Sequence, residues 1–288
     1  MTRTRVLTAL AMTPFAIAGI LLLPTPWLVA LAAVLFLVGL WEWFKLAEID
    51  DSLARTVLLV TNLALMVALA WGSRTASGGG TLVLFQIAVI VGVLWWLLAC
   101  LWLKHYRFAS DHDTHARAFK LAAGTLAVVP AWCALALLHA SDPTPSLIPG
   151  VPRGHVWLLV ALAIVWAGDT GAYFAGRAFG RHKLAPRISP NKTVEGLLGG
   201  MVCALAAAAF FGWCAGAATD QQPVVLAVAL ATFLASVIGD LFESLLKRHV
   251  GVKDSGDLLP GHGGILDRID AVLAALPVFA LGKLWLGF

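Results

Sequence analysis

The last third of the chain concentrates side chains that could bind a phosphate group and a metal ion. One apolar stretch carries four polar residues spaced so that they share one face of a helix: Asp240, Ser244, Lys247 and Arg248. A Gly-rich segment follows, and Asp267, Arg268 and Asp270 come after it. Carboxylates with basic side chains beside them suit Mg²⁺ and phosphate, because Mg²⁺ prefers hard oxygen ligands and cations hold phosphate oxygens. The pattern therefore predicts phosphate chemistry assisted by a metal.

Two earlier segments offer further polar groups. Asp169, Tyr173 and Arg177 lie four residues apart and share one helical face. In the segment 187–196, Ser189 or Thr193 can cap the following helix. A helix N-terminus with a lysine nearby is an anion-binding arrangement, and glycines allow a backbone to approach phosphate closely. We expect both segments to contribute to the same site.

Structural interpretations of the same residues stay open at this point. Asp240 could be a buried carboxylate that serves only structure, satisfied by Lys247 or by another helix, and Asp169 could cap or bridge helices. Lys247 and Arg248 alone could be anchors that reach the lipid headgroups. His262 lies among glycines, where a substrate contact and a structural turn are equally good interpretations.

The composition determines where these residues must sit. Of the 288 residues, 60% are apolar and only 12% are charged, about half the charged share of a soluble domain. We predict an all-α, polytopic integral membrane bundle of about nine helices. The apolar stretches are 7–23, 27–46, 56–72, 81–103, 121–139, 155–175, 194–217, 223–245 and 269–286. The first two are separated by a Pro-rich turn and could instead form a re-entrant hairpin.

The distribution of basic residues predicts the orientation. With a cytoplasmic N-terminus, 17 Lys and Arg fall in cytoplasmic connectors and only three outside, as the positive-inside rule requires. The net charge of +4 is too small and dispersed to indicate nucleic-acid binding. We expect residues 1–150 to form transmembrane packing helices. Residues 151–288 are expected to form the transmembrane catalytic region, with a polar cleft facing the cytoplasm.

The segment from Ser244 to Asp270 resembles the signature of phosphatidate cytidylyltransferases, also called CDP-diacylglycerol synthases. The shared pattern is S-x-x-K-R, then K-D, then P-G-H-G-G, then D-R-x-D. Segments 168–180 and 189–196 also resemble the family, so the likeness covers roughly the last 120 residues. Asn191 stands where many members carry Lys, which puts one phosphate contact in doubt.

The resemblance implies transfer of CMP from CTP to phosphatidic acid, giving CDP-diacylglycerol and pyrophosphate. It implies Mg²⁺ held by Asp240 and Asp267, with a monovalent cation such as K⁺ beside it. The remaining catalytic residues would be Ser244, Lys247, Arg248 and Arg268. Substrate-binding positions would be Asp169, Ser189, Lys192, Thr193, Glu195, Lys253, His262, Gly263 and Gly264. It further implies a homodimer in the cell inner membrane, among membrane lipids, with its site on the cytoplasmic side.

Two other function classes remain open from the sequence. Another CTP-dependent lipid enzyme, such as a polyprenol kinase or an archaetidyl-type cytidylyltransferase, would differ only in its lipid or phosphoryl acceptor. A transporter would also place ionisable residues in broken helices. It would, however, spread them across the membrane depth and show internal repeats, whereas here they crowd one side.

Overall fold

The computed structural model describes residues 13–73, 82–256 and 263–288. Eight of its helices are long and apolar enough to cross a membrane: α2 (Thr25–Leu46), α3 (Ser52–Gly72), α4 (Val83–Lys104), α5 (Thr114–Ala140), α6 (Arg153–Phe179), α7 (Val194–Cys214), α8 (Gln222–His249) and α9 (Leu266–Leu286). The protein is therefore a polytopic helical membrane protein, as predicted. Before α2 lies a shorter apolar helix, Thr13–Leu22. The expected first span, 7–23, begins outside the described residues, so the count of nine stays a prediction.

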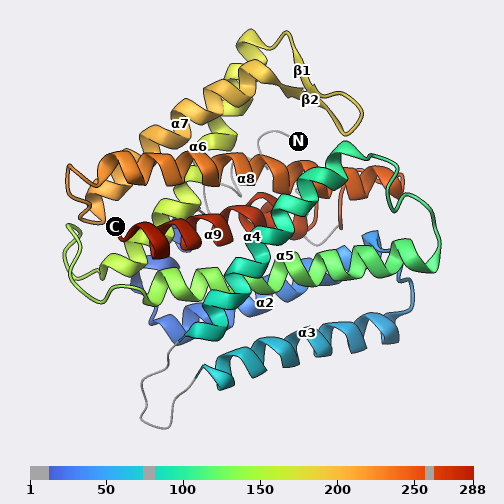
Figure 1. The fold of residues 1–288 in the computed structure, drawn as a ribbon, viewed down its shortest axis with the longest axis horizontal. Helices are drawn as coiled ribbons and strands as arrows, with labels where there is room; N and C mark the ends of the chain where they lie inside the picture. The colour runs from blue at the N-terminus through green and yellow to red at the C-terminus, as the bar shows by residue number, and fades with distance from the viewer. Residues whose placement is uncertain (1–12, 74–81, 257–262) are drawn as a thin grey trace.

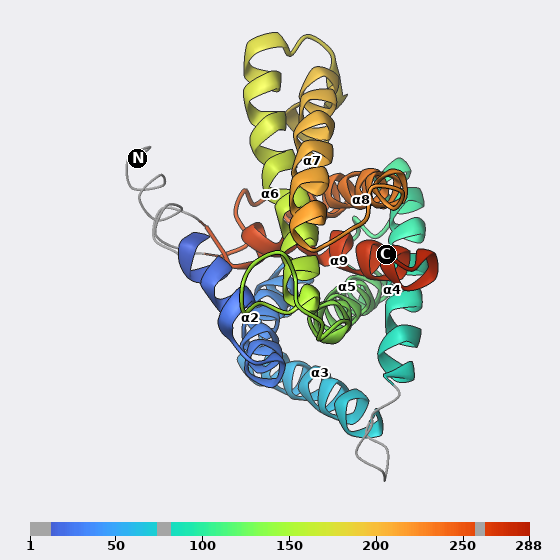
Figure 2. The same ribbon diagram turned by 90° about the vertical axis from the view of Figure 1, so that its left-hand side faces the viewer.

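Helix α9 runs through the middle of the bundle, where it contacts α8, α5, α4, α6 and α2 (Figures 1 and 2). Its central side chains Leu273, Leu276 and Phe279 are fully buried. In contrast, α3 lies at the edge, and only Asn62 and Met66 along it are buried. Among the described residues, both parts of the chain, 1–150 and 151–288, contribute to one hydrophobic core.

An aromatic cluster fixes the rotation of α8, the helix that carries the predicted catalytic face. Phe242 is fully buried and meets Trp102 at 5.2 Å, Trp95 at 5.8 Å, Trp96 at 5.9 Å and Trp43 at 6.0 Å between ring centroids. Aromatic pairs at such separations add stability beyond their buried area. With Phe242 held toward α2 and α4, the Asp240 side of α8 faces α6 and α7.

Helices α6 and α7 form a hairpin that projects from the rest of the bundle (Figure 2). Small residues let them approach closely: a Cβ added at Gly171 would lie 2.9 Å from the Gly199 carbonyl oxygen, and one at Gly200 would lie 2.6 Å from that of Gly168. Membrane helices commonly associate through such small residues. The close pairing places the ends of α6 and α7 side by side.

The connector between α6 and α7 holds the described strands, which the sequence did not predict. β1 (Lys183–Ala185) pairs antiparallel with β2 (Ser189–Thr193). Both are edge strands of a two-stranded sheet, so Pro190 is tolerated within β2. This small hairpin lies beside the end of α8, where Arg248 Nε donates to the Ile188 carbonyl at 3.1 Å.

Connectors that the charge count placed on one side of the membrane contact one another. Glu48, between α2 and α3, pairs with His112 and, at 3.2 Å, with Lys120. At the end of α8, His249 bonds the Tyr106 carbonyl at 2.7 Å. These contacts put the ends of α2, α4, α5 and α8 together, as an alternating topology requires.

Candidate active site

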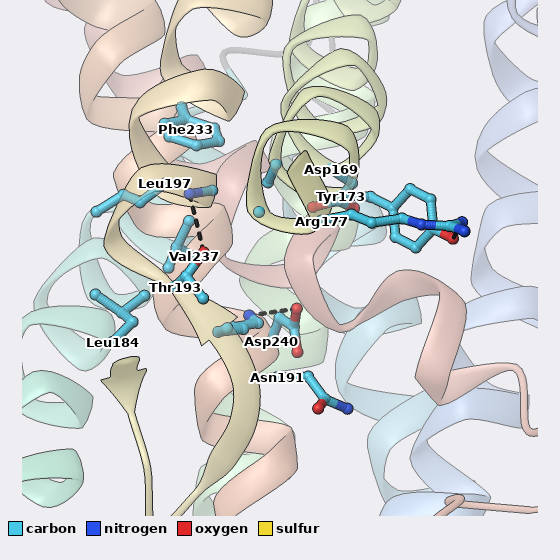
Figure 3. Close-up of a pocket in the computed structure, with 14 residues that line it drawn as sticks. Asp169, Tyr173, Arg177, Leu184, Asn191, Thr193, Leu197, Phe233, Val237 and Asp240 are labelled. Atoms are coloured by element: carbon cyan, nitrogen blue, oxygen red, sulfur yellow. Dashed lines mark hydrogen bonds and ion pairs between the residues drawn. The ribbon is translucent and has the colours of Figure 1, made fainter. Parts of the chain in front are cut away.

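A pocket of about 560 Å³ opens between α6, α7, α8 and β2 (Figure 3). Its polar lining includes Asp169, Arg177, Lys192 and Asp240, and its apolar lining includes Phe233. Lys192 and Asp240 form an ion pair across the pocket. Residues of α6, of the β1–β2 connector with the start of α7, and of the more distant α8 therefore meet around one cavity. That cavity has a charged part and an apolar part.

One face of helix α6 lines this pocket. Asp169, Tyr173 and Arg177 all line it, as their spacing predicted. Arg177 Nη1 donates to the Tyr173 hydroxyl at 3.2 Å, and Figure 3 shows these two side chains lying together. Asp169 lines the same pocket as Asp240 and Lys192.

Strand β2 and the first turn of α7 form the opposite wall. Thr193 caps α7, because its hydroxyl accepts from the Gly196 backbone N–H at 3.1 Å. Glu195 does not point into the pocket. Its carboxylate accepts from the backbone N–H groups of Arg181, at 3.0 Å, and His182, at 3.2 Å. The glutamate thereby ties the connector to α7, and Lys192 is the cation that reaches the pocket.

A second polar cluster lies where α8 ends and α9 begins; we call it the loop cluster. Lys247 Nζ lies 2.5 Å from Glu243 Oε2 and 2.7 Å from Asp267 Oδ1. Asp267 Oδ2 accepts from the Gly264 N–H at 2.8 Å, and from the Ser255 N–H and hydroxyl at 3.0 Å each. All of these side chains are buried or nearly so, which makes Lys247 the counter-ion of two carboxylates.

The pocket and the loop cluster are adjacent along α8, which contributes Asp240 to the pocket and Glu243 and Lys247 to the loop cluster. Asp270 lies in the first turns of α9, where its Oδ1 accepts from the Ala271 backbone N–H at 2.7 Å. Ser244 belongs to the pocket side, with its hydroxyl 3.4 Å from Asp240 Oδ1. The candidate site thus holds two charged groups, one in which Lys192 pairs with Asp240 and one in which Lys247 pairs with Glu243 and Asp267.

Comparison with known proteins identifies this arrangement. A profile of the Cytidylyltransferase family matches residues 3–284. The chain belongs to this family. It is 37% identical over 285 residues to the phosphatidate cytidylyltransferase of Pseudomonas aeruginosa, a match covering 99% of this chain and 97% of the relative. The Haemophilus influenzae protein of the same name is 35% identical over 290 residues, covering 97% and 98%. That of Bacillus subtilis is 49% identical over 128 residues, covering 43% and 46%.

Several positions named by the family resemblance lie outside the centre of the site. Arg248 is exposed and engages the Ile188 carbonyl through Nε. Lys253 and Arg268 are exposed at the edge of the loop cluster, and Ser189 is half-buried in β2. His262 lies outside the described residues.

Glycines 263 and 264 pack against the site rather than open space. Gly263 has φ +80°, a backbone conformation that favours glycine, and a Cβ there would lie 2.7 Å from Asp267 Oδ2. Gly264 donates its N–H to the same oxygen. Both residues therefore shape the backbone around Asp267.

Two carboxylates in the described site were not singled out from the sequence, Glu42 from α2 and Glu243 from α8. Asp270 of α9 was named with Asp267 in the sequence pattern but was given no role. Each had a sequence signal: an ionisable residue within an apolar span is a functional candidate by default. Glu243 also precedes Lys247 by four residues, the spacing of a helical ion pair.

The site fits a Mg²⁺ ion that is completed by substrate. Glu243 Oε1 is buried and has no hydrogen-bond partner among the described residues, and Asp267 Oδ1 accepts from Lys247 and keeps a lone pair. Asp240 lines the pocket, with Oδ2 paired to Lys192 and Oδ1 3.4 Å from the Ser244 hydroxyl. No cluster of three or more His, Cys, Asp or Glu side chains suited to a metal occurs in the described part of the chain. One or two carboxylates with phosphate oxygens and water are the usual Mg²⁺ shell.

Proposed function

We propose that the protein transfers CMP from CTP to phosphatidic acid, giving CDP-diacylglycerol and pyrophosphate. The observation that carries this proposal is the pocket in which the Lys192–Asp240 ion pair adjoins an apolar wall formed by Phe233, Val237 and Leu197. A lipid phosphate has the same two parts, a charged headgroup and an apolar chain. The family membership and the names of the relatives support the nucleotide and the lipid.

In the proposed reaction, a phosphate oxygen of phosphatidate attacks the α-phosphorus of CTP. A new P–O bond forms, the bond to the β-phosphate oxygen breaks, and pyrophosphate leaves. A phosphate monoester is already ionised near neutral pH, so no side chain must remove a proton. Catalysis then rests on positioning and on stabilising negative charge.

The side chains divide this work between the two clusters. Lys192 and Arg177 would bind phosphate oxygens in the pocket, and Lys247 would keep Asp267 ionised and oriented. Asp240 and Asp267 would hold Mg²⁺, which when bound neutralises charge on the phosphates; a monovalent cation such as K⁺ would add to this. Ser244 would contact a phosphate or the metal beside Asp240.

The same proposal sets the orientation and the assembly. CTP is a soluble nucleotide, so the pocket would open to the cytoplasm, with the protein in the inner membrane and its N-terminus inside. The excess of Lys and Arg in the connectors on the site's side supports this. A homodimer is proposed from the family resemblance alone, and the mass of the detergent-solubilised protein tests it.

Pyrophosphate release by the purified protein in detergent tests the reaction. With CTP, phosphatidic acid and Mg²⁺, we expect turnover in the parent protein and a loss of at least about a hundredfold in Asp267→Asn, because a metal-ligating and charge-paired carboxylate is removed. Asp254→Asn is the matched control, since this aspartate is exposed on the same segment. Folded protein that turns over a free polyprenol but not phosphatidate would refute the named reaction. Full activity of Asp267→Asn would refute the proposed role of Asp267 and leave the proposed reaction standing.

A further inference from the structure

A buried glutamate of α2 reaches into the loop cluster from the N-terminal part of the chain. Glu42 is 4% exposed. Its Oε2 accepts from the Leu266 backbone N–H at 2.8 Å and lies 3.1 Å from the Ser255 hydroxyl. Both partners lie more than 200 residues further along the chain. A carboxylate buried this deeply inside a membrane helix is costly unless hydrogen bonds stabilise it.

Glu42 supplies what the start of α9 lacks. The residue before this helix, Ile265, has no side-chain capping hydrogen bond. The first N–H groups of a helix have no partner within the helix and attract negative charge. Glu42 accepts one of these N–H groups, that of Leu266, and so caps α9 from a different helix.

Two glycines of the signature segment make room for this carboxylate. A Cβ built at Gly256 or Gly264 would overlap the carboxylate of Glu42. Gly256 and Gly264 thus let the backbone approach a protein carboxylate closely.

Ser255 connects Glu42 to the catalytic aspartate. Its backbone N–H donates to Asp267 Oδ2 at 3.0 Å, and its hydroxyl, with a single proton to donate, lies 3.1 Å from Glu42 Oε2 and 3.0 Å from Asp267 Oδ2. Glu42 also accepts the backbone N–H of Leu266, and Asp267 is the next residue along the chain. Glu42 thereby controls the position of Asp267 twice, through the backbone at the start of α9 and through the Ser255 hydroxyl.

We propose that Glu42 is a positioning residue: it holds Ser255 and the first turn of α9 so that Asp267 stays in place for the reaction. The inference rests on the proposed function for its catalytic consequence. Within the described residues, the hydrogen bonds of Glu42 go to Ser255 and Leu266, and neither residue lines the pocket. Its effect on turnover is therefore expected to pass through Asp267. What matters is its reach and its acceptor oxygen rather than its charge.

The test compares Glu42→Gln, Glu42→Asp and Glu42→Leu with the parent protein. Hydrogen exchange of the Leu266 amide reports the hold on α9, and pyrophosphate release gives kcat and KM for CTP. We expect Glu42→Leu to speed exchange of this amide by about tenfold to a hundredfold, the range for losing a hydrogen bond to a charged group, and to lower kcat about tenfold or more. Glu42→Gln keeps the reach and an acceptor, so kcat should fall only about threefold. Glu42→Asp is one methylene shorter and should resemble Glu42→Leu.

Glu48→Gln is the matched control. It also removes a carboxylate near the end of α2, but this carboxylate pairs with Lys120 and not with the start of α9. It should lower the Tm without changing Leu266 exchange or kcat. The proposal is overturned if Glu42→Asp has a higher kcat than Glu42→Gln, or if Leu266 exchange is unchanged in Glu42→Leu and Glu42→Asp. A parent protein that releases no pyrophosphate would remove the proposed function, whereas the exchange measurements would still decide whether Glu42 holds α9.

Discussion

Removing the shared cation of the loop cluster should destabilise the protein strongly. Lys247 is 12% exposed and contacts Glu243 and Asp267 at 2.5 and 2.7 Å. At an effective dielectric constant of about 20, each contact corresponds to about 6 kcal/mol of Coulomb attraction, much of it offset by desolvation. Replacing one partner of a buried pair typically costs about 3–5 kcal/mol. We therefore expect Lys247→Met to lose about this much stability.

Thermal unfolding in detergent measures this loss. At about 2 °C per kcal/mol for a chain of this size, the Tm of Lys247→Met should fall by about 6–10 °C. Turnover should also be lost, because Asp267 loses the cation that orients it.

A second substitution separates charge balance from packing. In Lys247→Met with Glu243→Gln, one uncompensated carboxylate is removed together with the cation, so the double variant should recover more than half of the lost Tm. Glu243→Gln alone should change the Tm little, since Lys247 still has its ion pair with Asp267. A double variant no more stable than Lys247→Met would give no coupling energy between the two sites and would refute the assignment of Lys247 as their shared counter-ion.

Two further predictions concern the pocket and the connectors. Lys192→Met should lower kcat/KM for CTP by about tenfold to a hundredfold, the range for losing a hydrogen bond to a charged group. The Tm should change little, because the Lys192–Asp240 pair is partly exposed. Unchanged kinetics would show that Lys192 does not belong to the site. For Glu48, burial raises the pKa, but hydrogen bonds from His112 and Lys120 outweigh it and hold the pKa below its ordinary value of 4.5. Its stabilising effect should therefore be complete well above pH 4.5 and be lost as the pH falls through its folded-state pKa. The Tm difference between the parent and Glu48→Gln should shrink over that range, and a difference independent of pH would contradict this pairing.

Much of the architecture was predictable because it depends on local properties. Apolar stretches of the right length identify membrane helices wherever they occur, and α8 and α9 lie where the sequence predicted them. The shared face of Asp169, Tyr173 and Arg177 follows from helical periodicity alone. The β1–β2 hairpin was not foreseen, because its short strands form only against the ends of α7 and α8.

The sequence by itself determined the class of protein, the family and the segments that carry its chemistry. The tertiary structure decided which polar groups meet. Lys192 pairs with Asp240, Lys247 is shared by Glu243 and Asp267, and Glu42 caps α9. Helical spacing specifies only neighbours on one helix, whereas contacts between helices depend on how each is rotated and packed. Here the buried Phe242 and the close packing of α6 against α7 set those rotations, and no local pattern in the sequence encodes them.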